Sequence, residues 1–170
     1  MPPNSDLVFL PYVLGEKTPL MDPHARGTLV GLGLRHDLRH VWRAALEGVV
    51  FGFRHHLDIF AERGLVQQIF AADGGAASDL WLQIAADVLQ RPVTHIDRHP
   101  GSSLGAAFVA GMGAGLLKDW ADIGRYVAPG RRFQPDLHAV AVLEHKYQLW
   151  RETYRRLPTM FPRLGSVFQN

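Results

Sequence analysis

The spacing of apolar residues changes along this chain, and each change predicts a different element. From Asp37 to about Arg63 apolar residues recur every three or four positions, which is typical of one buried stripe on a long helix. The stripe consists of Leu38, Val41, Trp42, Ala45, Leu46, Val49, Phe53, Leu57 and Phe60. We expect Asp37 to cap the first turn through its carboxylate, and Gly64 to end the last turn in a left-handed conformation.

Short apolar runs on both sides of this helix predict strands. Two precede it, Leu7–Tyr12 and Thr28–Leu34, and the segment Glu16–Arg26 between them contains the prolines of a loop. Two more follow, Leu65–Ala72 and Pro92–Ile96. They are rich in β-branched and apolar residues and too short for helices, so we expect strands at all four places.

Helical periods alternate with these later strands. Helices are predicted at Leu80–Gln90 and from Gly101 to about Gly115, which favours an α/β fold with a partly parallel sheet covered by helices. Ala128–Pro135 reads as a loop because it contains two prolines and a glycine. A terminal helix over about 138–157 follows from one apolar seam, and residues 1–170 are expected to form one domain. The seam is Leu143, Tyr147, Trp150, Tyr154 and Leu157.

The composition excludes several function classes. The chain has 170 residues, of which 47% are hydrophobic and 20% charged, as in an ordinary globular protein. A net charge of +2 without a basic run argues against nucleic acid. No cysteine is present, which removes disulfides and thiolate metal sites and permits a cytoplasmic location. The N-terminus lacks a signal pattern, and the weakly polar stretch 104–117 is too short to span a membrane.

Several polar or small residues have structural explanations. His36 and His40 could share a helix face, but no third ligand stands at metal-binding spacing, so we expect no metal site. Arg43 and Glu47 are four apart and are expected to form a surface pair of small value. The predicted helix after Gly101 has a face of small residues, which indicates close packing on the sheet. These residues are Gly105, Ala106, Ala110, Gly113 and Ala114.

The segment Asp73–Trp81 carries the main functional signal. Gly74 and Gly75 form a predicted turn between a strand and a helix, where main chain can approach a ligand because no Cβ intervenes. The helix that follows directs free amide groups and partial positive charge at that place, which suits a nucleotide. Asp79 either complements the helix dipole or binds the nucleotide. Because a carboxylate repels phosphates, a bound Asp79 would accept from a ribose hydroxyl or the adenine amino group.

The same segment resembles the adenosine segment of the FGGY carbohydrate kinases, and other blocks of the chain are similar to further parts of that family. The resemblance runs from about Phe9 to Trp150, and the xylulokinase-like branch fits best. The blocks are Phe9–Tyr12, Gly15–Pro19, Asp22–Pro23, Ala25–Gly27, Gly31–Leu32, Arg43–Val49, Gly74–Val93, Leu104–Ala107 and Ala110–Gly111.

This resemblance implies the C-terminal lobe of a two-lobed kinase with the ribonuclease-H-like, actin-like ATPase fold and a mixed sheet. The implied reaction transfers a phosphoryl group from ATP to a hydroxyl of a sugar or polyol. Gly74, Gly75, Asp79 and Gly31 would hold the adenosine end, while Mg²⁺ would be held mainly by ATP and the N-terminal lobe.

The family also places the sugar site and the catalytic base in the region before this chain begins. Asp73 is therefore not expected to be the base, and no catalytic residue is assigned within the chain. The isolated chain should be inactive, with a sugar bound only when the N-terminal lobe is present. A second copy of the chain is a further candidate partner, as a homo-oligomer.

A second hypothesis is a non-catalytic domain that binds nucleotide or only a protein partner, because the Gly-Gly turn is common to both. A Rossmann-type dinucleotide domain is a weaker alternative, since the chain lacks Gly-x-Gly-x-x-Gly.

Overall fold

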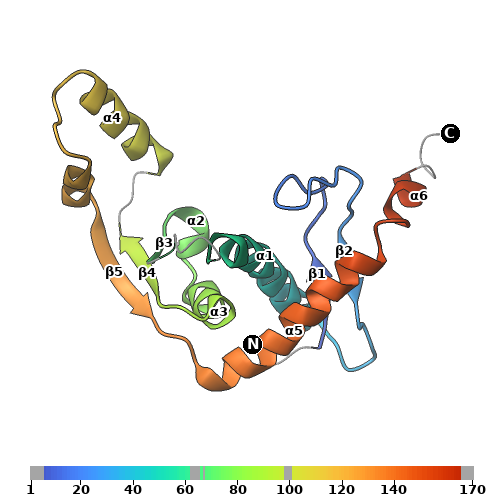
Figure 1. Ribbon diagram of the computed structural model, residues 1–170. Coiled ribbons are helices and arrows are strands. Elements are labelled where there is room, and N and C mark those ends of the chain that lie inside the picture. Colours follow the sequence, from blue (N-terminus) through green and yellow to red (C-terminus); the bar gives the residue numbers. More distant parts are fainter. Residues whose placement is uncertain (1–5, 62–65, 67, 98–100, 166–170) are drawn as a thin grey trace.

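The computed structural model describes residues 6–61, 66, 68–97 and 101–165. These form two small sheets and a group of helices between and around them (Figure 1). Gly64, which was expected to end the first long helix, lies outside the described residues. No helix in the described part of the chain is both long enough and apolar enough to cross a membrane.

The N-terminal part is a two-stranded sheet followed by the longest helix. Strand β1 (Val8–Leu10) pairs antiparallel with β2 (Thr28–Val30). Helix α1 (Leu38–Ala61) begins where the sequence predicts, because Asp37 Oδ1 accepts from the amide nitrogens of Arg39 and His40 at 3.0 and 3.3 Å. This confirms the predicted cap.

The second half contains a three-stranded mixed sheet. Strand β3 (Ile69–Ala71) pairs parallel with β4 (Val93–Asp97), and β4 pairs antiparallel with β5 (Ala128–Phe133). Helix α3 (Asp79–Leu89) connects the two parallel strands and packs on one face of the sheet through Leu82 and Ala86. The predicted mixed α/β arrangement is confirmed.

Strand β5 corrects the prediction of a loop over Ala128–Pro135. The sheet order is β3-β4-β5, so β5 is an edge strand, where a proline is tolerated because one side of the strand needs no partner. The pairing shifts between Thr94 and Ile96, and this irregularity accommodates the Pro129–Gly130 pair. Pro and Gly therefore marked a bulged edge strand here rather than a loop.

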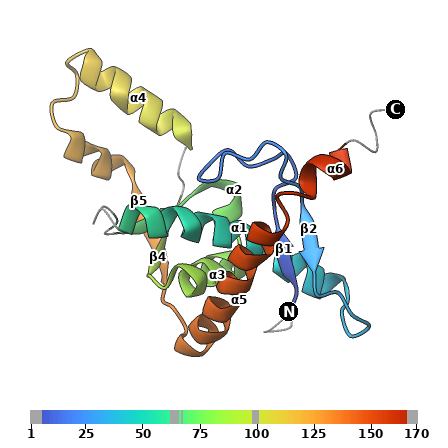
Figure 2. The same ribbon diagram turned by 45° about the vertical axis from the view of Figure 1, so that its right-hand side comes forward.

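Helix α4 (Ser102–Gly113) does not pack closely on the sheet, contrary to the expectation from its small residues. It projects away from the sheet, and within the described residues a Cβ at Gly105 or Gly113 would meet nothing within 4 Å (Figures 1 and 2). Its one buried side chain, Phe108, lies against the rings of Trp120 and Tyr126 from the short 3₁₀ helix η1 (Trp120–Tyr126).

The main core lies where α1, α3, β1 and α5 (Leu137–Arg156) meet, with a short final helix α6 (Phe161–Gly165) beside it. The predicted seam of the terminal helix is confirmed, since Leu143, Tyr147 and Trp150 are buried there. The Trp150 indole also donates to the carbonyl of Phe9 at 3.0 Å, which fixes α5 to β1.

Helix α1 buries a different face from the predicted stripe. Leu38 is 81% exposed, Trp42 58% and Phe53 54%. Gly48 explains the rotation, because a Cβ there would lie 2.2 Å from the carbonyl oxygen of Phe9, so only glycine allows this close approach to β1. The residues that the helix buries are Arg43, Ala44, Glu47, Gly48, Val50 and Phe51.

The same rotation corrects the expectation of a surface Arg43–Glu47 pair. Arg43 Nε donates to Glu47 Oε1 at 2.7 Å, and Lys146 of α5 donates to Glu47 Oε2. Glu47 is 1% exposed and Lys146 5%. The three charges therefore form a buried cluster that joins α1 to α5.

Candidate functional site at the carboxyl ends of β3 and β4

The parallel strands β3 and β4 end at one edge of their sheet, and the conspicuous glycine segment lies directly beyond β3. Open α/β sheets bind ligands at this edge, outside the carboxyl ends of parallel strands. The predicted Gly-Gly turn is in fact a single helical turn, α2 (Asp73–Ala76). Ala77 and Ser78 amides donate back to the Gly74 and Gly75 carbonyls at 3.3 Å. The side chain of Asp73 lies outside what the structure describes.

Gly74 and Gly75 meet different surroundings. A Cβ on Gly74 would find no heavy atom within 4 Å among the described residues, so its backbone faces open space. A Cβ on Gly75 would lie 2.0 Å from Cζ3 of Trp81. Packing of the Trp81 indole is therefore sufficient reason for a glycine at position 75, whereas Gly74 leaves main chain accessible to a ligand.

Asp79 lies in the first turn of α3, as predicted, but it is not isolated. Ser78 caps the helix, with its hydroxyl accepting from the Trp81 amide at 3.3 Å. Arg131 of β5 donates through Nη1 to Asp79 Oδ2. The side chains of Arg131 and Asp79 are 60% and 55% exposed, so this ion pair is open to solvent.

The position of Arg131 follows from the alternation of side chains along β5. Phe133 faces α3 and packs beside Val93, whereas Arg132 opposes Thr94 on the other face. Arg131 is two residues from Phe133 and so shares the α3 face, with its guanidinium 5.7 Å from the Phe133 ring centre. The sequence prediction missed Arg131, because Pro129 and Gly130 indicated a loop without alternation.

Gly31 lies in a different part of the molecule. It follows β2 at φ +95°, and a Cβ there would be 3.0 Å from the carbonyl oxygen of Asp6. Asp6 in turn contacts His36, whose Nε2 lies 2.7 Å from Asp6 Oδ1. This hydrogen bond lowers the pKa of the Asp6 carboxyl. The described structure brings Gly74 and Asp79 together at one sheet edge, but it does not bring Gly31 to them.

The end of β4 adds two titratable side chains to the same edge. His95 Nδ1 lies 2.9 Å from Asp97 Oδ1, and a Cβ at Gly130 would be 2.6 Å from the Asp97 carboxyl. Among the described residues no group of three histidine or carboxylate side chains could hold a metal ion. Among the described residues, the groups at this edge that could contact a ligand are backbone amides, the carboxylates of Asp79 and Asp97, the His95 imidazole and the Arg131 guanidinium.

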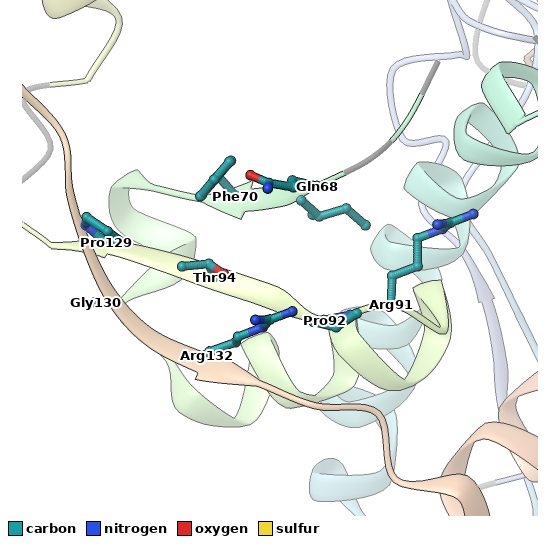
Figure 3. A pocket seen from close by; sticks show the side chains of 9 residues that line it. Gln68, Phe70, Arg91, Pro92, Thr94, Pro129, Gly130 and Arg132 are labelled. Atoms are coloured by element: carbon teal, nitrogen blue, oxygen red, sulfur yellow. The ribbon is translucent and has the colours of Figure 1, made fainter. Parts of the chain in front are cut away.

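Two cavities flank the sheet, and they differ in character. One of about 330 Å³ lies between α1, β3 and α3 and is lined by apolar residues such as Phe53, Phe70 and Trp81. It offers little to hold a phosphate. The other, of about 440 Å³, lies on the opposite face of the sheet, where Figure 3 shows Phe70, Thr94 and Arg132 on three neighbouring strands.

Comparison with known proteins identifies the family. The model of the C-terminal domain of the FGGY family of carbohydrate kinases matches residues 1–114, which is most of the chain. The chain belongs to this family. The FGGY domain match includes α1, the Gly74–Asp79 segment and α4, whereas Arg131 of β5 lies beyond its last matched residue.

Individual FGGY kinases extend the match beyond that model. A xylulose kinase of Bacillus subtilis (strain 168) is 29% identical over 166 residues, which is 96% of this chain and 33% of the relative. A glycerol kinase of Geobacter sp. (strain M21) is 37% identical over 154 residues, or 89% of this chain and 31% of the relative.

A solved structure agrees with the fold. The crystal structure of xylulose kinase from Rhodospirillum rubrum superimposes with a TM-score of 0.78 at 42% identity, covering 92% of this chain and 31% of that one. The chain thus spans about a third of the length of the FGGY kinases that it matches. Its α/β architecture is that of the C-terminal, actin-like ATPase lobe of the family.

Proposed function

We propose that this chain is the adenosine-binding C-terminal part of a cytoplasmic, ATP-dependent sugar or polyol kinase. The observation that carries the proposal is the FGGY domain match over residues 1–114, which includes the open Gly74 backbone at the carboxyl ends of β3 and β4. The xylulose kinases among its relatives favour a pentulose-like sugar as the acceptor.

The described residues suit the adenosine side of ATP. Gly74 presents main chain without a side chain in the way, and Asp79 offers a carboxylate to ribose or adenine donors. Gly75 supports the site by accommodating Trp81. Gly31 follows β2, on another element of the same lobe, so its part in adenosine binding is proposed from the family resemblance alone.

ATP would supply the phosphoryl group, and Mg²⁺ would enter with it. Since the described residues contain no three-ligand group, the ion would be held mainly by the phosphates and by the N-terminal lobe. That lobe would also provide the sugar site and the catalytic base. A non-catalytic nucleotide-binding or interaction domain is the alternative function.

A kinase assay tests the proposal. The purified chain with ATP, Mg²⁺ and xylulose or glycerol should release no sugar-dependent ADP, because the proposal assigns the base and the sugar site to the N-terminal lobe. A chimera in which the chain replaces the matching third of the Rhodospirillum rubrum xylulose kinase should release it. Robust turnover by the isolated chain, or a folded chimera that binds no nucleotide, would contradict the proposal.

A further inference from the structure

Asp79 raises an electrostatic difficulty for the proposed nucleotide site. Its carboxylate lies in the first turn of α3, where it offsets the partial positive charge that would otherwise attract a phosphate. Arg131 removes this difficulty because it neutralises Asp79 from the neighbouring strand β5. We propose that Arg131 is the anion-binding residue of the nucleotide site and contacts the phosphate nearest the adenosine. This role rests on the proposed function.

The geometry leaves Arg131 able to bind a second anion. The guanidinium has five N–H donors, and the hydrogen bond to Asp79 Oδ2 comes from Nη1. The guanidinium lies over the Phe133 ring, with Cζ 5.7 Å from the ring centre, and this contact keeps the side chain on the α3 face of the sheet. More than half of the side chain is exposed, so a phosphate can reach the remaining donors.

The energetics also permit exchange between the two anions. A solvent-exposed ion pair is worth little, so parting or sharing the Arg131–Asp79 pair costs little. A phosphate oxygen accepts from arginine in a charge-assisted, often bidentate geometry, which is the stronger interaction. Asp79 would then accept a hydrogen bond from the ribose, and Arg131 would donate to the phosphate. Before a nucleotide binds, the ion pair between them would keep both side chains in position.

The experiment compares adenosine, AMP and ADP as ligands of the 170-residue chain, with affinities measured from amide shifts of Gly74–Asp79. Arg131→Gln should lower the affinities for ADP and AMP about tenfold, which is the effect of losing one charged hydrogen bond. It should lower the affinity for adenosine by less than about twofold. Arg131→Lys should recover part of the lost ADP and AMP affinity, because lysine keeps the positive charge but lacks the planar, bidentate donors of the guanidinium.

Arg132→Gln is the matched control. It removes the same charge from the adjacent residue, but Arg132 lies on the opposite face of the sheet with Phe70 and Thr94 (Figure 3). It should leave all three affinities unchanged. Equal losses of ADP affinity in the two variants would reveal a general charge effect and would overturn the role of Arg131.

Two further outcomes separate this role from its alternatives. If Arg131 only positions Asp79, then Arg131→Gln will weaken adenosine and ADP alike, which overturns the proposal, as does an unchanged ADP affinity. Asp79→Asn should lower the affinity for adenosine. The ratio of ADP affinity to adenosine affinity should stay unchanged, because that ratio depends on the phosphate contact. If the wild-type chain shows no nucleotide-dependent shifts at Gly74–Asp79, the proposed function itself fails, and the role of Arg131 with it.

Discussion

Gly74 and Gly75 are neighbours in α2, but only one of them has room for a side chain. Trp81 fills the space beside Gly75, whereas none of the described residues occupies the space beside Gly74. The sequence alone could predict that this pair was special, because two glycines between a strand and a helix are a strong local signal. It could not separate their roles, since the position of the Trp81 ring depends on how α3 packs against α1 and β3.

This difference predicts opposite outcomes for two single substitutions. Gly75→Ala should lower the free energy of unfolding by about 1–3 kcal/mol, because a methyl group is forced against a packed indole. Gly74→Ala should change it by less than about 1 kcal/mol, since alanine suits a helical turn better than glycine. Urea denaturation of the two variants measures both values. Equal destabilisation would mean that Trp81 is not the reason for Gly75.

At the scale of elements, the local patterns located most strands and helices, but they indicated the wrong buried face for α1 and did not predict β5. The terminal helix seam around Tyr147 and Trp150 is buried as predicted. The apolar stripe of α1 is not, because Gly48 lets the opposite face approach β1. Similarly, Pro129 and Gly130 indicate a loop in the sequence, and they are compatible with strand β5 only because β5 lies at the edge of its sheet. Both errors arise from tertiary contacts that local spacing does not contain.

The buried charge cluster of α1 and α5 gives an element-scale prediction. Glu47→Ala should lower the free energy of unfolding by about 3–5 kcal/mol, because it leaves Arg43 and Lys146 buried without their carboxylate. Glu152→Ala on α5, which removes the exposed partner of Arg156, should cost less than about 1 kcal/mol. Chemical denaturation compares the two variants.

A double-mutant cycle then tests the pairing itself. Combining Glu47→Ala with Lys146→Met should cost clearly less than the sum of the single substitutions, because the second change removes the buried ammonium group that has lost Glu47. Strictly additive costs would show that Glu47 and Lys146 do not interact in the folded chain.

At the scale of the whole molecule, the exposed apolar surface needs a partner. The outer face of α1 carries Leu38, Trp42 and Phe53, and Phe53 borders the apolar cavity beside β3, which is an edge strand of the described sheet. Surfaces of this kind mark interaction sites. The chain spans about a third of the length of its relatives. Under the proposed function this surface would pack against the rest of the kinase, and in the isolated chain against a second copy.

We therefore predict that the isolated chain self-associates. Light scattering over a concentration series should show a mass that rises above that of a monomer. Trp42→Glu, which places a charge in the middle of the exposed face, should shift the rise to higher concentration. Leu137→Glu, at an exposed residue at the start of α5, is the control and should leave it unchanged. A strictly monomeric wild-type chain at high concentration would contradict the prediction.

The family could be predicted from sequence because it depends on the order and spacing of several blocks rather than on one motif. The candidate site could be predicted only in part. Gly74 and Asp79 lie between a strand and a helix, as expected, whereas the Arg131 contact depends on the pairing of β4 with β5, and Gly31 lies on another element.

The most direct test of the account is an ADP titration of the isolated wild-type chain, followed residue by residue through backbone amide shifts. Half of a two-lobed cleft encloses only part of a nucleotide, so binding should be weak. The shifts should nevertheless cluster on Gly74–Asp79 and on Arg131, at the carboxyl ends of β3 and β4. Shifts confined to α5, or no shifts at saturating ADP, would contradict the account.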